Sequence, residues 1–256
     1  MNGARPILDE SSRQVLAEYA LANVIIALDY DGTLSPITRR PQDAKMRPRT
    51  KTLLHAIARR YPTVAISGRA LADVSERLKG VPLWHVFGNH GIEGTPYQSD
   101  DTPLVREWLD LLARELPADL GIFIEDKGHS LSLHTRQARD RRRAYAAIDR
   151  AVAQLPEVTV IGGKEVVNLL PPGRGNKGVA LDFAMRAFVC SHAIYVGDDD
   201  TDEDAFRVAE AAPVLGIRVG RSETTLAQYY VETQEQVDDL LEALVRLRHG
   251  APHRLT

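Results

Sequence analysis

Two aspartates, Asp29 and Asp31, stand at the end of the apolar run 25–28, and this pair constrains the chain more than any other feature. The run predicts a buried β-strand, and the Gly32-Thr33 step after it predicts the turn that ends this strand. Side chains two residues apart point to the same side of a strand. We therefore expect both carboxylates at the strand's carboxyl end, which is the edge where open α/β sheets bind their ligands.

Two carboxylates held close together repel each other unless a cation lies between them or one of them keeps a proton. Such a pair suits Mg²⁺ together with a carboxylate nucleophile that accepts a phosphoryl group. A hydrogen-bonded aspartate turn is a second interpretation, and a calcium loop is a third. The calcium loop requires a glutamate at its twelfth position, which is Arg40 here, so that interpretation is excluded.

A second group of acidic residues, 198–204, follows the apolar run 193–196 and Gly197. Acidic residues are favoured at the start of a helix by capping and by the helix dipole, which accounts for Asp202 and Glu203. This preference does not account for Asp198 and Asp199, which come directly after the strand. Because hard cations take oxygens from several chain segments, we expect this group to complete the site of the first pair.

Two further residues fit the same site. Ser67 ends the apolar run 64–66, and its hydroxyl and nearby backbone N–H groups can hold a phosphate or cap the following helix. Lys177 follows a glycine-rich turn and begins an apolar helical pattern, where its ammonium group can neutralise a phosphoryl group in transfer. The turn is not a Walker A loop, because its glycine spacing differs and no Ser or Thr follows Lys177.

Strand and helix patterns alternate in the first and last parts of the chain, which predicts a parallel sheet with helices on both faces. Strands are predicted at 23–29, 62–66, 83–88, 192–196 and 213–218, and helices at 48–60, 70–79, 176–188, 202–209 and 234–247. The middle of the chain has helices near 102–116 and 138–154, strand-like runs at 122–125 and 130–134, and two strands around a Gly162-Gly163 hairpin turn. We predict an α/β core domain, residues 1–98 and 173–256, and an inserted α+β domain, 99–172.

Composition excludes several other classes of protein. The net charge of −3 gives no electrostatic reason to bind nucleic acid or an anionic membrane. No segment approaches the roughly 20 apolar residues of a membrane span, and the first residues show no signal peptide. Cys190 is the single cysteine, which excludes an intramolecular disulfide. We expect a cytoplasmic protein that is a monomer or a weak homo-oligomer.

The order of these motifs resembles the haloacid dehalogenase superfamily of phosphatases, whose four motifs match Asp29/Asp31, Ser67, Lys177 and Asp198/Asp199. More closely, the chain resembles trehalose-6-phosphate phosphatases over about residues 23–231. The segments that carry this resemblance are 28–37, 88–93, 125–128 with Leu131 and His134, 163–164 and 197–203. The resemblance implies a Rossmann-like core with an inserted cap domain, Mg²⁺ as cofactor, and hydrolysis of trehalose 6-phosphate to trehalose and phosphate.

The resemblance also implies a role for each motif. Asp29 would form an aspartyl-phosphate, and Asp31 would act as general acid and then as general base. Ser67 and Lys177 would bind the phosphate oxygens. The expected metal ligands are Asp29, the Asp31 carbonyl, Asp198 and Asp199, with Asp202 supporting them. The expected substrate-binding residues are Ser67, Gly68, Arg69, Asn89, His90, Glu125, Lys127, His134, Lys164 and Asn168.

The predicted strand 130–134 has an apolar face with Leu131 and Leu133, and a polar face with Ser130, Ser132 and His134. The polar face either meets solvent or, following the resemblance, looks toward the active site and binds the sugar. The family carries a glutamate in a Val-x-Glu-x-x-Pro pattern where this chain has Asn168, so the identity of the sugar stays open.

Other functions therefore stay open as well. A glycosyl-phosphoglycerate, sucrose phosphate or glucosylglycerol phosphate is an alternative substrate for a related phosphatase. A phosphomutase of the same superfamily and a non-catalytic module that binds sugar phosphate or metal are alternatives of other classes.

Overall fold

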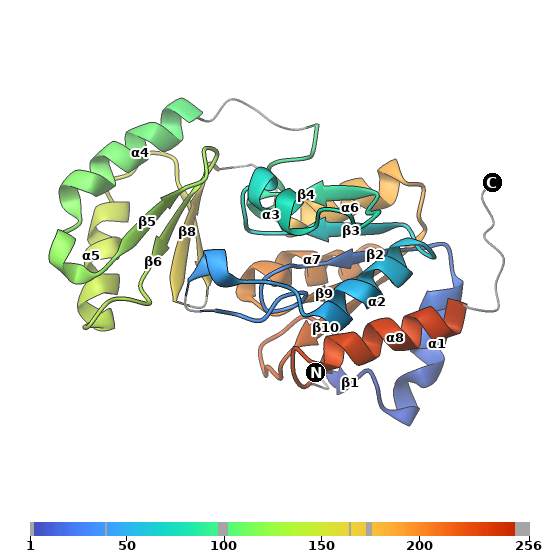
Figure 1. The fold of residues 1–256 in the computed structure, drawn as a ribbon. Helices are drawn as coiled ribbons and strands as arrows, with labels where there is room; N and C mark the ends of the chain where they lie inside the picture. The colour runs from blue at the N-terminus through green and yellow to red at the C-terminus, as the bar shows by residue number, and fades with distance from the viewer. Residues whose placement is uncertain (1–2, 39, 97–101, 164, 173–175, 249–256) are drawn as a thin grey trace. The chain divides into compact units, whose positions relative to one another are not determined.

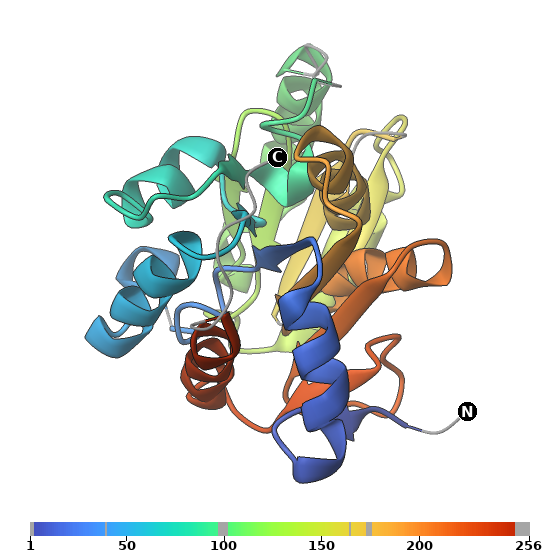
Figure 2. The ribbon, with the colours of Figure 1, turned by 90° about the vertical axis from the view of Figure 1, so that its right-hand side faces the viewer.

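The computed structural model describes residues 3–38, 40–96, 102–163, 165–172 and 176–248 (Figures 1 and 2). These residues form two compact units. The first contains the described residues up to Thr95 and from Asn176 onward, and the second contains those that lie between. Within the described residues, every helix is too short or too polar to cross a membrane.

The first unit contains a seven-stranded sheet in which neighbouring strands all pair in parallel. Its strands are β1 (Arg5–Pro6), β2 (Val24–Leu28), β3 (Thr63–Ile66), β4 (His85–Phe87), β9 (His192–Gly197), β10 (Val214–Val219) and β11 (Tyr229–Val231). Its α-helices are α1 (Arg13–Leu21), α2 (Pro48–Ala58), α3 (Leu71–Arg77), α6 (Lys177–Ala187), α7 (Glu203–Arg207) and α8 (Gln236–Arg248). Short 3₁₀ helices span Glu10–Ser12, Pro41–Asp43, Asn89–Gly91, Asp200–Asp202 and Val208–Glu210.

The strand order β1-β11-β10-β9-β2-β3-β4 places a topological switch between β2 and β9. From β2 the chain proceeds through β3 to β4 on one side, and from β9 it proceeds through β10 to β11 on the other. Connections that leave in opposite directions open a crevice at the carboxyl ends of the two central strands. The fold therefore predisposes the ends of β2 and β9 to carry the functional site.

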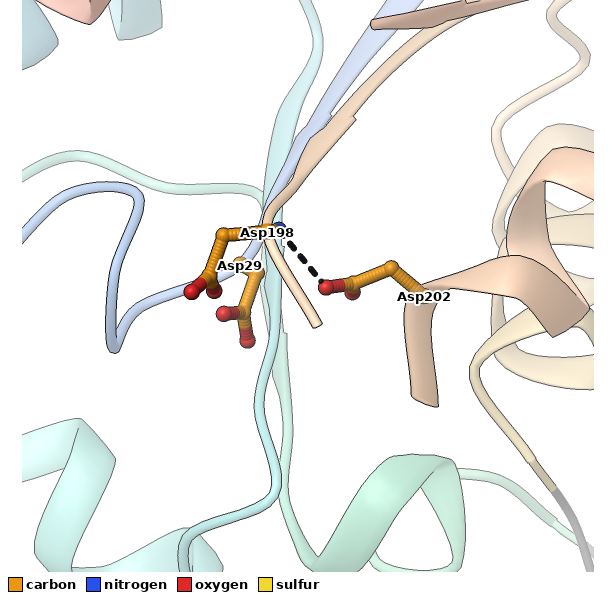
Figure 3. Close-up of side chains that lie close together, drawn as sticks. All are labelled: Asp29, Asp198 and Asp202. Carbon is orange, nitrogen blue, oxygen red and sulfur yellow. Dashed lines mark hydrogen bonds between the residues drawn. The ribbon is translucent and has the colours of Figure 1, made fainter. Parts of the chain in front are cut away.

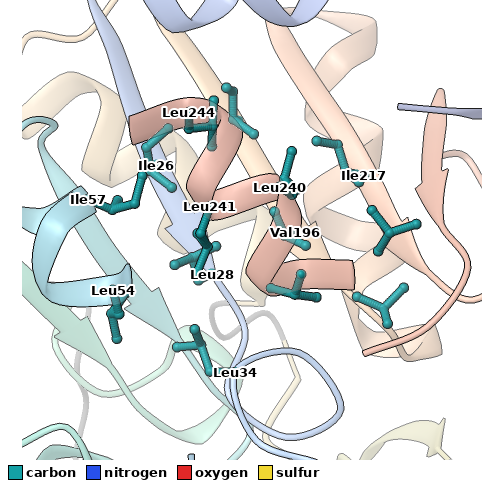
Figure 4. Packing of buried hydrophobic residues seen from close by; sticks show 14 of the residues in the cluster. Ile26, Leu28, Leu34, Leu54, Ile57, Val196, Ile217, Leu240, Leu241 and Leu244 are labelled. Atoms are coloured by element: carbon teal, nitrogen blue, oxygen red, sulfur yellow. The ribbon is translucent and has the colours of Figure 1, made fainter. Parts of the chain in front are cut away.

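Alternate residues of the central strands pack into two different cores, because helices cover both faces of the sheet. Ile26 and Leu28 pack on one face with α1, α2, α3 and α8, as Figure 4 shows for Leu240, Leu241 and Leu244 of α8. Figure 2 shows α1, in blue, and α8, in dark red, next to each other on this face. On the other face, Ile25 and Ala27 pack with α6 and α7. The next residue on that second face is Asp29, so the alternation directs its carboxylate toward α6.

The second unit is a four-stranded antiparallel sheet, ordered β5-β6-β8-β7, with two α-helices on one face (Figure 1). Its elements are α4 (Thr102–Glu115), a 3₁₀ helix (Ala118–Leu120), β5 (Phe123–Asp126), β6 (Leu131–His134), α5 (Arg141–Val152), β7 (Thr159–Gly163) and β8 (Val166–Leu170). Leu131 and Leu133 are fully buried and pack with Trp108 of α4 and Ile148 of α5. The predicted apolar face of β6 is thus confirmed.

The predicted α/β fold class is confirmed, but the predicted Gly162-Gly163 hairpin turn is wrong. Both glycines belong to β7 and pair with Val167 and Val166 of β8. In the described part of this hairpin, Glu165 has a left-handed backbone, with φ of 62°. A glycine pair is compatible with a turn, but it also fits an extended strand, and here pairing with β8 decides between the two.

Candidate active site

Three carboxylates meet at the switch between β2 and β9. Asp29 directly follows β2, Asp198 directly follows β9, and Asp202 ends the 3₁₀ helix Asp200–Asp202. One oxygen from each carboxylate lies within 4.8 Å of an oxygen of the other two (Figure 3). The predicted convergence of the first aspartate and the second acidic group is therefore seen in the fold.

A buried lysine lies among these carboxylates. Lys177 Nζ donates hydrogen bonds to Asp29 Oδ1 at 3.0 Å and to Asp202 Oδ1 at 2.7 Å, and its side chain is 3% exposed. The side chain of Asn176 accepts a hydrogen bond from the N–H of Val179, so α6 begins at Lys177. Burial opposes the charge of the ammonium, but Asp202 and Asp29 outweigh it and raise the pKa of Lys177 above its ordinary value. Lys177 is therefore a fixed positive charge beside Asp29.

Asp202 organises the loop that follows β9. Its Oδ2 accepts the backbone N–H groups of Asp198 and Asp199, both at 2.9 Å, and its Oδ1 accepts the Tyr195 hydroxyl at 2.6 Å in addition to Lys177. A Cβ at Gly197 would come 2.2 Å from the Asp202 carboxyl carbon, so this approach requires glycine. With four donors on its two oxygens, Asp202 supports the site by fixing the loop.

Asp198 contributes a carboxylate oxygen that the protein leaves unpaired. Its Oδ1 is inaccessible to solvent and has no hydrogen-bond partner among the described residues. Burial, together with Asp29 and Asp202, raises the pKa of Asp198 well above its ordinary value. Burial likewise raises the pKa of Asp29 to about 8, although Lys177 lowers it. These carboxylates need more positive charge than Lys177 supplies, and a hard divalent cation that binds oxygen ligands fits this need.

Asp31 has a different environment from Asp29. Its two carboxylate oxygens accept Nε and Nη2 of Arg69 at 2.6 and 2.7 Å, and its side chain is 40% exposed. The Asp199 carboxylate, in turn, accepts the N–H of Asp200 at 2.8 Å and caps the 3₁₀ helix. The structure thus brings Asp29, Asp198 and Asp202 together, whereas Asp31 pairs with an arginine and Asp199 serves as a cap.

The turn after β3 is built closely against the loop after β4. Ser67 is buried, and its Oγ accepts the N–H of Arg69 at 3.2 Å. A Cβ at Gly68 would come 2.6 Å from the His90 ring, and His90 N–H donates to the Ser67 carbonyl at 2.9 Å. Asn89 Nδ2 donates to Glu93 Oε2 at 3.0 Å. These residues stiffen the turn that presents Ser67 at the carboxyl edge.

In the second unit, the predicted sugar-binding residues share the polar face of the sheet. Glu125 lies opposite Ser132 in the β5–β6 ladder, and Ser132 lies opposite Asn168 in the β6–β8 ladder. The Ser132 hydroxyl donates to Asn168 Oδ1 at 2.7 Å. His134 Nε2 lies 2.8 Å from Glu125 Oε2, and Lys127 Nζ lies 3.9 Å from the same oxygen. Lys164, which was also predicted to bind the sugar, lies outside the described residues.

Sequence reasoning missed two residues of the first unit. Tyr195 stands inside an apolar run and looked like a core residue, although its hydroxyl orients Asp202. Asp73 accepts Arg69 Nη1 at 2.6 Å and helps to hold the guanidinium that binds Asp31. The available signal was the spacing of four residues between Arg69, just before α3, and Asp73 in the first turn of that helix.

Comparison with known proteins identifies the family. The sequence profile of the trehalose-phosphatase family matches residues 27–238, which is more than half of the chain. The chain belongs to the trehalose-phosphatase family. The matched range includes Asp29, Asp31, Lys177, Asp198 and Asp202.

Individual relatives in the trehalose-phosphatase family agree with this assignment. The trehalose-phosphate phosphatase of Mycolicibacterium paratuberculosis is 34% identical over 209 residues, which cover 76% of this chain and 53% of the relative. That of Mycobacterium tuberculosis is 34% identical over 250 residues, which cover 90% of this chain and 63% of the relative. The chain thus spans about half to two-thirds of the length of these relatives.

A solved structure supports the fold independently. The C-terminal domain of Candida albicans trehalose-6-phosphate phosphatase superposes with a TM-score of 0.78, covering 96% of this chain and 99% of that one. The two sequences are 22% identical in the superposition, so this likeness concerns the fold alone.

Proposed function

We propose that this chain is a Mg²⁺-dependent phosphatase that hydrolyses trehalose 6-phosphate to trehalose and inorganic phosphate. The observation that carries the proposal is the position of Asp29, which is buried, bonded to the Lys177 ammonium, and within 4.8 Å of an oxygen of the Asp198 carboxylate. A carboxylate nucleophile for phosphoryl transfer needs positive charge around it, since both it and the substrate are anionic. Membership of the trehalose-phosphatase family indicates the substrate.

In the proposed mechanism, Asp29 attacks phosphorus in line, and the bond from phosphorus to the sugar oxygen breaks. Asp31 gives a proton to that leaving oxygen, and an aspartyl-phosphate remains on Asp29. A water molecule then attacks this intermediate, Asp31 takes the proton of the water, and inorganic phosphate leaves. Lys177 and the turn at Ser67 neutralise the phosphate oxygens in both steps.

Asp29, the Asp31 carbonyl and Asp198 would hold the magnesium ion, and Asp199 and Asp202 would support them. The ion would supply a positive charge that screens the approach of the phosphate dianion to Asp29. The unpaired Asp198 oxygen and the raised pKa values of Asp29 and Asp198 support this assignment.

We further propose that the first unit is the catalytic core and the second unit a cap that recognises the sugar. The polar face of its sheet offers donors and acceptors of the kind that bind sugar hydroxyls, from Glu125, Lys127, His134 and Asn168. Asn89 and His90 remain predicted contacts of the substrate. A cytoplasmic location and a monomeric or weakly oligomeric state remain predictions from the sequence.

The test is phosphate release from a panel of sugar phosphates, with Mg²⁺ or with a chelator, by the natural chain and by Asp29→Asn. We expect a Mg²⁺-dependent preference for trehalose 6-phosphate that Asp29→Asn abolishes. Asp182→Asn is the matched control, because Asp182 lies on the exposed side of α6 and pairs with Arg186. Hydrolysis retained by Asp29→Asn would refute the nucleophile assignment.

The same panel separates the alternatives. Preference for a glycosyl-phosphoglycerate, sucrose phosphate or glucosylglycerol phosphate would support the proposed reaction mechanism and contradict the proposed sugar. Asn168, which stands where the family has a glutamate, is the residue that leaves this alternative open. An isomerised sugar phosphate without free phosphate would indicate a mutase. Metal binding without turnover of any substrate would indicate a binding module.

A further inference from the structure

Arg69 was predicted to bind the substrate, but most of its N–H donors form hydrogen bonds within the protein. Nε and Nη2 bind the two oxygens of Asp31, Nη2 also donates to the Pro41 carbonyl at 2.7 Å, and Nη1 donates to Asp73 at 2.6 Å. A guanidinium has five N–H donors, and the described residues accept from four of them. One remaining donor is too few for the two-pronged grip by which arginine binds a phosphate.

Other parts of the chain also hold the guanidinium in place. Its central carbon lies 5.5 Å from the centre of the Tyr30 ring, and the Arg69 side chain is only 9% exposed. Asp73 on α3 and the Pro41 carbonyl fix it from two other segments of the chain. The Arg69 guanidinium is therefore fixed in position, whereas the Asp31 side chain that it binds is 40% exposed and reaches solvent.

We propose that Arg69 is a positioning residue that holds the Asp31 carboxylate for proton transfer, and that it is not a ligand of the substrate phosphate. This inference rests on the proposed function, in which Asp31 donates the proton to the leaving oxygen. Each carboxylate oxygen of Asp31 keeps a second lone pair beyond its bond to Arg69. The paired hydrogen bonds from Arg69 therefore restrict where the carboxylate can lie and leave a lone pair on each oxygen directed away from the guanidinium.

The proposal predicts a dependence on the leaving group. A sugar alkoxide leaves only with a proton, whereas the stabilised phenolate of p-nitrophenyl phosphate leaves without one. A positioned general acid contributes roughly 10²–10⁴-fold to rate. For Arg69→Met we therefore expect kcat/KM for the sugar phosphate to fall about 100-fold and kcat/KM for p-nitrophenyl phosphate to fall less than about tenfold. The parameter kcat/KM is chosen because it excludes the later hydrolysis of the intermediate.

Arg77 provides the matched control. Its guanidinium lies 6.0 Å from the same Tyr30 ring and binds the same Asp73, at 2.9 Å from Nε. In the described part of the chain, however, Asp31 is bonded by Arg69 and not by Arg77. Arg77→Met should therefore lower kcat/KM for both substrates by a similar small factor.

Two results would overturn the inference. An equal fall for both substrates in Arg69→Met, with weaker competitive inhibition by inorganic phosphate, would make Arg69 a phosphate ligand. Equal behaviour of Arg69→Met and Arg77→Met would make its role structural. If Arg69→Met does not fold, Arg69→Lys takes its place, because one ammonium cannot bind Asp31 and Asp73 as the fork does. Failure of the proposed function would show separately, as a natural chain that releases no phosphate from any sugar phosphate.

Discussion

The close approach of Gly32 to Asp198 gives the sharpest test of the site geometry. Gly32 has a φ of 81°, and a Cβ built on it would lie 2.1 Å from Asp198 Oδ2 and 2.2 Å from Asp198 Cγ. Gly80 has a similar φ of 86°, but a Cβ there meets no atom of the described residues within 4 Å apart from its own chain neighbours. The two positions therefore separate backbone strain from displacement of the carboxylate.

An alanine at either position costs roughly 1–2 kcal/mol, because this left-handed conformation crowds a Cβ against the following carbonyl. Gly80→Ala should show this loss of unfolding free energy and no change in Mg²⁺ affinity. In Gly32→Ala the new methyl group pushes away the Asp198 carboxylate, the side chain that has an unpaired oxygen. Displaced ligands and their supports typically cost 10–100-fold in metal affinity, so Gly32→Ala should weaken Mg²⁺ binding by about this factor.

The assay combines urea denaturation in the presence of a chelator with calorimetric titration of Mg²⁺, on the natural chain and both variants. Mg²⁺ affinity that is unchanged in Gly32→Ala would refute the reasoning, because the metal would then not depend on the position of Asp198.

Three further predictions follow from particular contacts. Tyr195→Phe removes a buried hydrogen bond to a carboxylate and should lower the unfolding free energy by roughly 1.5–3 kcal/mol. The control Tyr61→Phe removes a hydrogen bond to the Leu244 carbonyl and should cost about 1 kcal/mol. Equal losses of the two variants in urea denaturation would contradict this prediction. Val189 is 78% exposed and has a φ of 54°, which is a strained backbone conformation for a β-branched residue. Val189→Gly should relieve about 1 kcal/mol of backbone strain and raise the melting temperature, and a lower melting temperature would contradict this. Without metal, the pKa of Asp29 in the folded protein is about 8, which is above its value in the unfolded chain, so folding takes up a proton between these two pKa values. The unfolding free energy of the metal-free protein should therefore fall by up to about 1.4 kcal/mol per pH unit as the pH rises toward 8. Mg²⁺ binds the deprotonated form, so the rise in melting temperature that it causes should be larger at pH 8 than at pH 6, and equal rises would count against the assignment.

Much of the fold could be predicted because the central strands are buried on both faces and bounded by clear turns. The runs that end at Leu28 and Val196 are continuous apolar segments, and acidic residues at their ends mark the sheet edge that carries the site. The short strands β1 and β11 could not be predicted in this way. Each has two or three residues and exists because it pairs with a neighbour, which no local pattern encodes.

The sequence also did not allow us to predict which residues the site residues contact. Asp31 and Arg69 are 38 residues apart, and their pairing depends on how the turn after β3 packs beside the end of β2. Asp202 was predicted to support the site, but its four donors are the Lys177 ammonium on α6, the Tyr195 hydroxyl on β9, and two backbone N–H groups of the loop after β9. Tyr195 stands in an apolar run that is typical of a core strand. A sequence gives the types of residue at the sheet edge, whereas the three-dimensional packing decides which of them touch.

The most direct test of the central claim is to mix the chain with Mg²⁺ and trehalose 6-phosphate, quench with acid within milliseconds, and locate the phosphoryl group by peptide mass spectrometry. The account predicts a phosphoryl group on Asp29 that is absent in Asp29→Asn. A phosphoryl group on another residue, or turnover of the substrate in Asp29→Asn, would contradict the account.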